Sequence, residues 1–319
     1  MIAVHSGSGG PMIELRRLHR FFGKTPAVQD VSFEVDRGGV FGFIGPNGAG
    51  KTTTMRILAT LELPSYGDAR IAGVSCVTDP DKVRSRMGFM PDGFGTYANM
   101  NCVEYLDFFA RSFGLVGRER TDAIRHTLGY TGLDKIAAKS IRGLSKGMRQ
   151  RLCLGRAMIH DPDVLILDEP ANGLDPRARI ELRQMITGLA ARGKTVLVSS
   201  HILTELGEMC DQIGIIERGQ LLAVGGVEDI RAQQQAHTSV AIRTLGDPSP
   251  LAAFLGDQEL VSGVRADGGE VHLMFAGDAA AQAALLQRVV AGGFVVVEFR
   301  SKPVSLEDVF MKITTGAVQ

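Results

Sequence analysis

The stretch from Gly45 to Thr52 reads G-P-N-G-A-G-K-T and matches the pattern G-x-x-x-x-G-K-[S/T] of a phosphate-binding loop. Phosphate oxygens need several backbone N–H donors converging on one point, and glycines let the backbone curve with positive dihedrals and keep side chains out of the way. The apolar residues 40–44 precede the loop and an amphipathic segment, residues 53–61, follows it. The sequence therefore predicts a strand, a phosphate-binding loop and a helix whose N-terminus near Lys51 adds partial positive charge.

The residues of this loop have expected roles toward a nucleoside triphosphate. Lys51 reaches the β- and γ-phosphates, and the hydroxyl of Thr52 is placed to ligate Mg²⁺. A glycine-rich turn that matches by chance is the alternative, and the flanking strand and helix argue against it. The nucleotide-binding residues expected here are Gly45, Pro46, Asn47, Gly48, Ala49, Gly50, Lys51, Thr52 and Thr53.

Two adjacent carboxylates, Asp168 and Glu169, follow a second apolar run, residues 164–167. Continuous apolarity is typical of a strand covered on both faces in a parallel sheet, and ligands gather at the carboxyl ends of such strands. We expect Asp168 to bind the same Mg²⁺ as Thr52 and Glu169 to act as the general base toward water. An acidic pair that only caps the next helix is the alternative.

Three further residues belong to the same chemistry if the sheet brings them together. Ser145 is a good N-cap for a helix that runs to about residue 160, and Gly147 in its first turn would let a phosphate approach the backbone. An ordinary capped helix fits these residues as well. His201 ends a buried strand predicted over residues 195–200, at the sheet edge of the carboxylates, and is a candidate γ-phosphate contact, although a single histidine is usually structural.

The elements that must position these groups are visible as hydrophobic patterns. Residues 12–18 and 28–35 alternate apolar and polar side chains, as half-buried antiparallel strands do, with a loop expected over residues 19–24. Phe22 in that loop suits stacking on an adenine ring, and a core phenylalanine suits its position equally. The other elements predicted in this half are short strands over 69–73 and 87–91, helices over 102–113 and up to 138, and a helix over 176–192.

Bulk composition limits the class of protein. The charged residues balance at 35 basic and 35 acidic, which argues against a nucleic-acid partner. Cys76, Cys102, Cys153 and Cys210 are scattered, as expected for buried thiols in a reducing compartment. No run approaches the roughly 20 apolar residues of a membrane-spanning helix, and residues 1–11 lack the features of a secretory signal. We expect a flexible lead over residues 1–11 and a cytosolic protein that reaches a membrane only through another component.

Together these stretches resemble, over about residues 13–224, the nucleotide-binding domain of an ATP-binding-cassette (ABC) transporter. The resemblance implies an α/β fold, a P-loop ABC ATPase core with an antiparallel β subdomain and a helical insert over about residues 95–160. It also implies that the core spans residues 12–232. The family's motifs correspond to residues 45–52 (Walker A), 164–168 (Walker B), 144–148 (signature), 173–175 (D-loop) and His201 (switch histidine).

The resemblance also implies roles for single residues and a working assembly. The catalytic set would be Glu169, His201 and Lys51, and the metal set Thr52, Asp168 and Asp92. Phe22, as the adenine-stacking aromatic, and Ser145, Gly147 and Asp175 would join the ATP-binding set. In this family the signature helix of one subunit covers ATP held by the other, which implies an ATP-dependent homodimer.

Two positions depart from the family pattern. The signature reads LSKGM where LSGGQ is commonest, so Lys146 adds a cation near the phosphates, while Ser145 and Gly147 remain. Asp92 stands where the family usually has glutamine. A shorter, charged side chain there puts in doubt the coupling between nucleotide and transport partner, although it can contact Mg²⁺ through water.

From about residue 233 the pattern changes to that of a small α+β appendage, residues 233–319. Strands are predicted over 239–243, 270–275 and 294–299, and a helix over 279–290. Residues 305–310 are similar to the C-terminal segment of ABC-2-type export ATPases. No residue pattern in the appendage indicates chemistry, and a regulatory or dimer-supporting role is the hypothesis.

The functional hypothesis is an ATPase subunit that binds ATP and Mg²⁺ and powers a membrane exporter. It would be cytoplasmic and would dock on transmembrane permease subunits at the inner face of the cell membrane. One alternative is a soluble ABC ATPase that acts on ribosomes or DNA, but the second cassette or long coiled coil of such proteins is not seen here. Another is an ATP-gated scaffold without hydrolysis, against which Glu169 and His201 argue.

Overall fold

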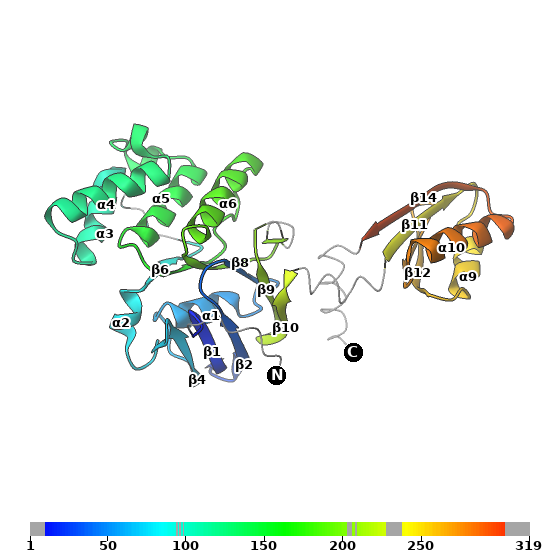
Figure 1. Ribbon diagram of the computed structural model, residues 1–319, viewed down its shortest axis with the longest axis horizontal. Helices are drawn as coiled ribbons and strands as arrows, with labels where there is room; N and C mark the ends of the chain where they lie inside the picture. The colour runs from blue at the N-terminus through cyan, green and yellow to red at the C-terminus, as the bar shows by residue number, and fades with distance from the viewer. Residues whose placement is uncertain are drawn as a thin grey trace. The chain divides into compact units, whose positions relative to one another are not determined.

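A computed structural model describes residues 10–227 and 238–303, except residues 94, 96, 98, 203–205 and 208. The chain divides into two compact units, Met1–Gly226 and Val227–Gln319, and each is described by itself (Figure 1). The first unit contains two β-sheets and a group of helices. The described residues of the second form a smaller sheet with two helices.

The first sheet of the larger unit is antiparallel, with the strand order β2-β1-β4-β5. Its strands are β1 (Ile13–Phe22), β2 (Thr25–Val35), β4 (Tyr66–Ile71) and β5 (Val74–Ser75). The loop predicted over residues 19–24 was wrong for most of its length, because β1 continues until Phe22 pairs with Thr25. His19 and Phe21 stack on each other and meet Tyr66 edge-on, so contacts with β4 stabilise this extended end of β1.

The second sheet has six strands in the order β10-β9-β3-β8-β7-β6. Its members are β3 (Val40–Ile44), β6 (Met87–Met90), β7 (Val164–Leu167), β8 (Thr195–Ser200), β9 (Gln212–Glu217) and β10 (Gln220–Gly226). All neighbouring pairs are parallel except β9 with β10. The strands predicted from continuous apolar runs, β3, β7 and β8, are confirmed and buried along their whole length.

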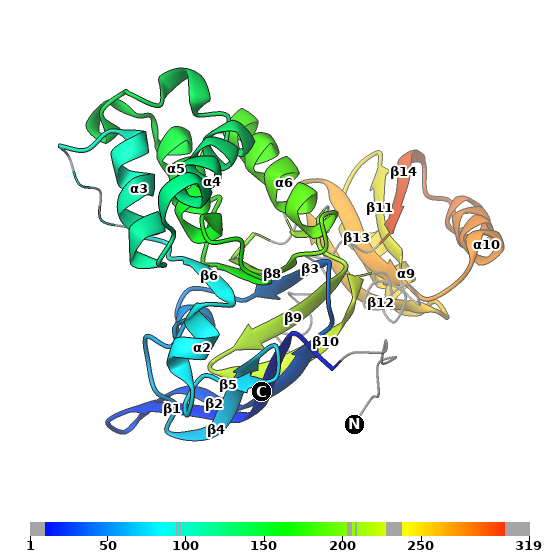
Figure 2. The same cartoon turned by 60° about the vertical axis from the view of Figure 1, so that its left-hand side comes forward.

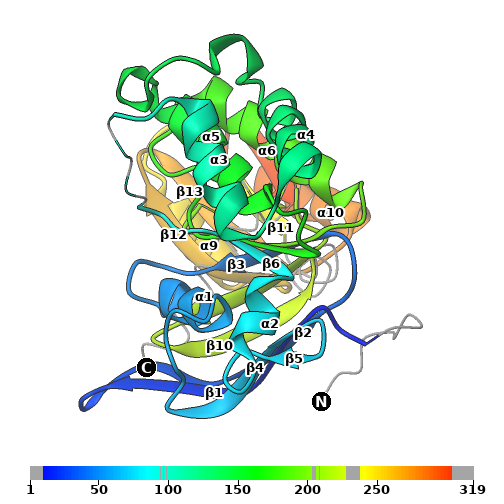
Figure 3. The same cartoon turned by 90° about the vertical axis from the view of Figure 1, so that its left-hand side faces the viewer.

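Helices cover both faces of the six-stranded sheet. On one face, α1 (Lys51–Leu58) lies between this sheet and the antiparallel one, where Met55, Ile57 and Leu58 join a core shared by both sheets (Figure 3). The helices on the other face are α3 (Cys102–Ser112), α4 (Gly117–Tyr130), α5 (Lys146–Met158) and α6 (Pro176–Ala190) (Figure 2). The first three enclose a separate apolar cluster around Tyr105, Leu106 and Leu152.

Short helical pieces complete the larger unit. They are α2 (Pro80–Arg84) and the 3₁₀ turns Asp134–Ile136 and Ile141–Gly143. All four cysteines are buried and free, as the sequence predicted for idle thiols. Across the part of the chain that the structure describes, no helix combines the length and apolarity needed to cross a membrane.

The smaller unit is built on an antiparallel sheet with the order β12-β13-β11-β14. Its elements are β11 (Thr238–Thr244), α9 (Ser249–Gly256), β12 (Val261–Asp267), β13 (Glu270–Phe275), α10 (Ala279–Ala291) and β14 (Val296–Pro303). Its core contains Val240, Ile242, Leu273, Phe275 and Leu285. Strand β12 and helix α9 were not predicted, and residues 305–310 lie outside the described residues.

Candidate functional site

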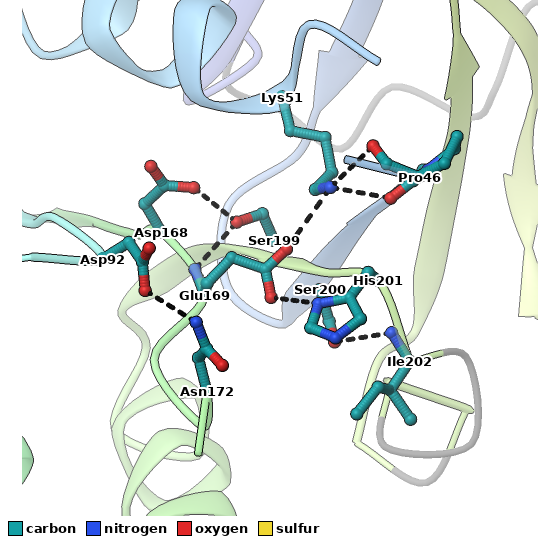
Figure 4. A network of polar contacts seen from close by, with 11 residues as sticks. Pro46, Lys51, Asp92, Asp168, Glu169, Asn172, Ser199, Ser200, His201 and Ile202 are labelled. Carbon is teal, nitrogen blue, oxygen red and sulfur yellow. Dashed lines mark hydrogen bonds and ion pairs between the residues drawn. The ribbon is translucent and has the colours of Figure 1, made fainter. Parts of the chain in front are cut away.

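The parallel strands β3, β8, β7 and β6 are consecutive neighbours, so their carboxyl ends lie along one edge of the sheet. The chain leaves β3 into the phosphate-binding loop, β7 into Asp168 and Glu169, β8 into His201, and β6 toward Asp92. Ligand sites in parallel α/β sheets form at this edge. Residues that are far apart in the sequence are therefore neighbours here (Figure 4).

The backbone of the loop is shaped by glycines for two different reasons. Gly50 has φ 105° and Gly48 φ 81°, in the region that side chains disfavour. Gly45 differs from the prediction, because it has no positive φ. Its requirement is space, since a Cβ there would lie 2.3 Å from the carbonyl oxygen of Ile216. The first turn of α1 then presents its N–H groups, because its first backbone bond runs from Thr54 back to Gly50.

A pocket of about 480 Å³ opens at this edge, a volume typical of small-molecule sites. Every residue from Asn47 to Thr53 lines it, together with Asp92, Glu169 and His201, all expected site residues. Ala27 and Asn172 also line it and were not expected. The pocket therefore combines a phosphate-type cradle with two carboxylates and an imidazole.

Lys51 is held inside the pocket by oxygen atoms. Its Nζ donates to the carbonyl oxygens of Gly45 at 2.6 Å and Pro46 at 3.2 Å, and lies 3.3 Å from Oε1 of Glu169 (Figure 4). The side chain is only 5% exposed, so these partners compensate for the lost hydration of its charge. An incoming phosphate would exchange one anionic partner of Lys51 for another.

Glu169 is positioned by its backbone and by two neighbours. Its φ of 48° is unusual for a residue with a side chain, and its N–H donates to Oγ of Ser199 at 2.9 Å. Its Oε2 lies 2.8 Å from Nδ1 of His201. An ionised carboxylate only accepts hydrogen bonds, so Nδ1 is the protonated nitrogen of His201 when Glu169 is charged. The carboxylate thus lies between a lysine and a histidine at the pocket wall.

Asp168 lies deeper than Glu169 and is 1% exposed. Burial raises the pKa of Asp168, while hydrogen bonds from Ser199 and Thr52 oppose the shift. The bond from Oγ of Ser199 to Oδ1 of Asp168 measures 2.7 Å. The carboxylate of Asp168 and the hydroxyl of Thr52 are hard oxygen donors in mutual contact, a donor set that fits Mg²⁺.

Ser199 was overlooked in the sequence although it touches both carboxylate residues. Its hydroxyl donates to the side chain of Asp168 and accepts from the backbone N–H of Glu169. The sequence contained one indication, because Ser199 and Ser200 directly follow the apolar residues 196–198 of a strand expected to be buried, and Ser199 is fully buried in the structure. A buried hydroxyl in such a strand needs polar partners, and here they are the functional carboxylates.

Comparison with known proteins agrees with this geometry. Residues 28–172 match the family described as "ABC transporter", and residues 225–314 match "ATP-binding protein DrrA1-3-like, C-terminal domain". The Nod factor export ATP-binding protein I of Cupriavidus pinatubonensis is 34% identical over 303 residues, which cover 95% of this chain and 90% of that protein. The chain belongs to the ABC transporter ATP-binding proteins.

Other relatives extend the comparison. A probable multidrug ABC transporter ATP-binding protein of Escherichia coli, YbhF, is 38% identical over 233 residues, which cover 72% of this chain but only 40% of that protein. A solved structure described as the ATP-binding subunit of an ABC transporter superposes with a TM-score of 0.64 at 31% identity, covering 70% of this chain and 93% of that chain. The cassettes of this family bind and hydrolyse ATP, and this chain is therefore an ATPase.

Asp92 of this ABC ATP-binding protein is exposed and accepts a hydrogen bond of 3.1 Å from the amide of Asn172. Both residues line the pocket, so Asn172 connects the end of β6 to the segment after Glu169. Asn172 was not among the expected site residues, and this contact was not predicted. No local pattern could have found it, because 80 positions separate the two residues.

Seven expected site residues do not line the pocket. Gly45, Pro46 and Asp168 adjoin lining residues in the chain, whereas the other four belong to other parts of the unit. Ser145 caps α5 by accepting from the N–H of Met148 at 3.3 Å, and Asp175 caps α6 by accepting from the N–H of Ala178 at 2.9 Å. Gly147 packs closely on α6, and Phe22 lies at the end of the β1–β2 hairpin and is half exposed. In this chain the phosphate-binding loop therefore lies apart from Ser145 and Gly147 at the start of α5 and from Asp175 at the start of α6.

Proposed function

We propose that this chain is the ATP-hydrolysing subunit of a membrane exporter. In this proposal two copies clasp ATP and Mg²⁺ at their interface and dock on transmembrane permease subunits at the inner face of the cell membrane. Relatives described as a multidrug transporter subunit and as a Nod factor export protein support the exporter assignment.

The geometry supports a division of labour among the site residues. Lys51 and the N–H groups at the start of α1 bind the β- and γ-phosphates of ATP. Glu169 accepts the proton of the attacking water, and His201 holds the carboxylate through Nδ1 at 2.8 Å. Thr52 and Asp168, with Asp92 through water, would hold Mg²⁺, which neutralises charge on the phosphates when it is bound.

The observation that carries the dimer proposal is the separation of the two halves of the site. Ser145 and Gly147 begin a helix of more than three turns, and Asp175 begins another, yet none of these residues lines the P-loop pocket. A helix start of this kind favours anions. A second copy would bring its Ser145 and Gly147 to the γ-phosphate and complete the site.

The test is Glu169→Gln in the full chain. We expect the variant to bind ATP, to accumulate as an ATP-dependent dimer, and to turn over at least about a hundredfold more slowly, the scale of a general base. Light scattering with and without Mg-ATP measures the dimer, and phosphate release measures turnover. Glu181→Gln is the control, because this partly exposed carboxylate of α6 pairs with Arg177 and does not line the pocket. Unchanged phosphate release in Glu169→Gln, or a monomer at saturating ATP, would refute the proposal.

A further inference from the structure

A guanidinium lies against the aromatic ring that ends β1. The Cζ atom of Arg20 is 4.6 Å from the centroid of Phe22, within the range of a cation–π contact. The two residues are two positions apart in β1, and this contact places their side chains on the same side of the hairpin, although the register with β2 shifts between Arg20 and Phe21. Phe22 is 50% exposed, which leaves ring surface available for a ligand.

Arg20 itself is held in place. Its guanidinium forms an ion pair with Glu62 at 2.5 Å, and the two side chains are only 23% and 22% exposed. Its Nε is buried without a hydrogen-bond partner among the described residues, so part of its charge faces the ring rather than an acceptor. The guanidinium of Arg20 is thus held against the ring of Phe22 by the ion pair with Glu62, unlike that of an exposed surface arginine.

The hairpin that carries Phe22 abuts the phosphate-binding loop. Phe22 pairs with Thr25 at the start of β2, and Ala27, two residues further, lines the nucleotide pocket. The loop touches this strand, because a Cβ on Gly50 would lie 2.5 Å from the carbonyl oxygen of Ala27. A base extending from phosphates in the loop toward the hairpin end would therefore reach Phe22.

We propose that Arg20 is a positioning residue for Phe22 and that the Arg20–Phe22 stack favours a purine base at this site. This inference rests on the proposed binding of ATP. The guanidinium fixes the ring before the ligand arrives, which lowers the entropy cost of stacking. It also draws π-electron density toward itself, so the outer face of Phe22 is a better partner for a large, electron-rich purine than for a pyrimidine.

The experiment measures dissociation constants of the full-length protein for Mg-ATP, Mg-CTP and magnesium tripolyphosphate, which has no base. For Arg20→Met we expect about two- to fivefold weaker ATP binding, a smaller ATP-to-CTP preference and unchanged tripolyphosphate binding. Arg20→Met should have no further effect in a Phe22→Ala background. Arg16→Met on the same strand is the control, because its guanidinium pairs with Glu14.

The outcomes separate this inference from the proposed function. If the unmodified protein binds neither ATP nor tripolyphosphate, the proposed function fails and the inference falls with it. If the unmodified protein binds ATP, and the Arg20→Met variant has the same dissociation constants for ATP and CTP as the unmodified protein, only the inference is overturned. Equal weakening of ATP and tripolyphosphate would also overturn it, because that pattern indicates general damage. A thermal melt of each variant reports whether the loss of the Glu62 ion pair disturbs the fold.

Discussion

Lys51 carries the positive charge that phosphate groups would meet in the pocket, and three oxygen atoms hold it there. We expect Lys51→Ala to weaken ATP binding about 10- to 100-fold, because a charge-assisted hydrogen bond to phosphate is lost. Isothermal titration of ATP measures the effect. Lys82→Ala is the matched control, since that side chain is 73% exposed and pairs with Asp79. Normal ATP affinity in Lys51→Ala would contradict the role of the loop.

Asp92 brings a second carboxylate to the pocket beside that of Glu169, and its contact with Asn172 fixes its position. Asp92→Gln keeps an acceptor for Asn172 but removes the charge. We expect the Mg²⁺ concentration for half-maximal ATPase activity to rise about two- to fivefold, because one anionic group near the metal is lost. Asn172→Ala should also raise this Mg²⁺ concentration, because the side chain of Asp92 loses the hydrogen bond that positions it. An unchanged Mg²⁺ requirement in both variants would contradict a role of Asp92 in binding the metal.

At the scale of elements, His160 connects three of them. It follows the end of α5, its Nε2 lies 3.1 Å from the carbonyl oxygen of Met87 at the start of β6, and its ring stacks on Phe113, just beyond α3, at 3.6 Å. Its Nδ1 is buried with no hydrogen-bond partner among the described residues. Burial lowers the pKa of His160 from 6.5 to about 4, against smaller opposite effects of the hydrogen bond with the Met87 backbone and of the charge of Asp161.

This contact predicts a pH dependence of stability. Between pH 6.5 and about 4 the unfolded chain binds a proton at His160 that the folded chain does not, so the free energy of unfolding falls as pH falls through this window. The contribution is on the order of 3 kcal/mol. We expect His160→Gln to flatten the dependence, measured by urea denaturation at several pH values. His126→Gln, an exposed histidine of α4, should leave the slope as in the unmodified chain, and equal slopes in all three proteins would contradict the prediction.

At the scale of the whole molecule, the two units have separate apolar cores. Among the described residues, the core of the smaller unit comprises residues between 240 and 299, and the site residues all belong to the larger unit. We expect Leu273→Ala to lower the stability of the smaller unit by about 2–5 kcal/mol and to leave ATP affinity unchanged. Hydrogen exchange resolved by segment, with ATP titration in parallel, measures both. A loss of ATP affinity would show that the units are energetically coupled.

Much of this architecture was readable from local patterns, and the failures have physical reasons. Buried strands such as β7 were predicted correctly because a short, continuous run of apolar residues is typical of a strand that is covered on both faces of a parallel sheet. Strand β12 was missed because a register shift between Ser262 and Arg265, around Gly263, breaks its alternation. Helix α9 was missed because its short sequence lies between proline and glycine and resembles a turn. The end of β1 was predicted as a loop because its irregular register with β2 and its contact with Tyr66 in β4 leave no regular apolar–polar alternation in the sequence.

The sequence by itself determined the chemistry of this protein, because the phosphate-binding loop, the two carboxylates after an apolar run and the capped helix starts are each local patterns of residue type and spacing. Only the tertiary structure decided which groups meet. The contacts of Glu169 with Lys51 and His201, of Asp92 with Asn172, and of Ser199 with both carboxylates join strands that are distant in the chain. Sheet order sets these distances, and no local pattern of residues contains the order of the strands.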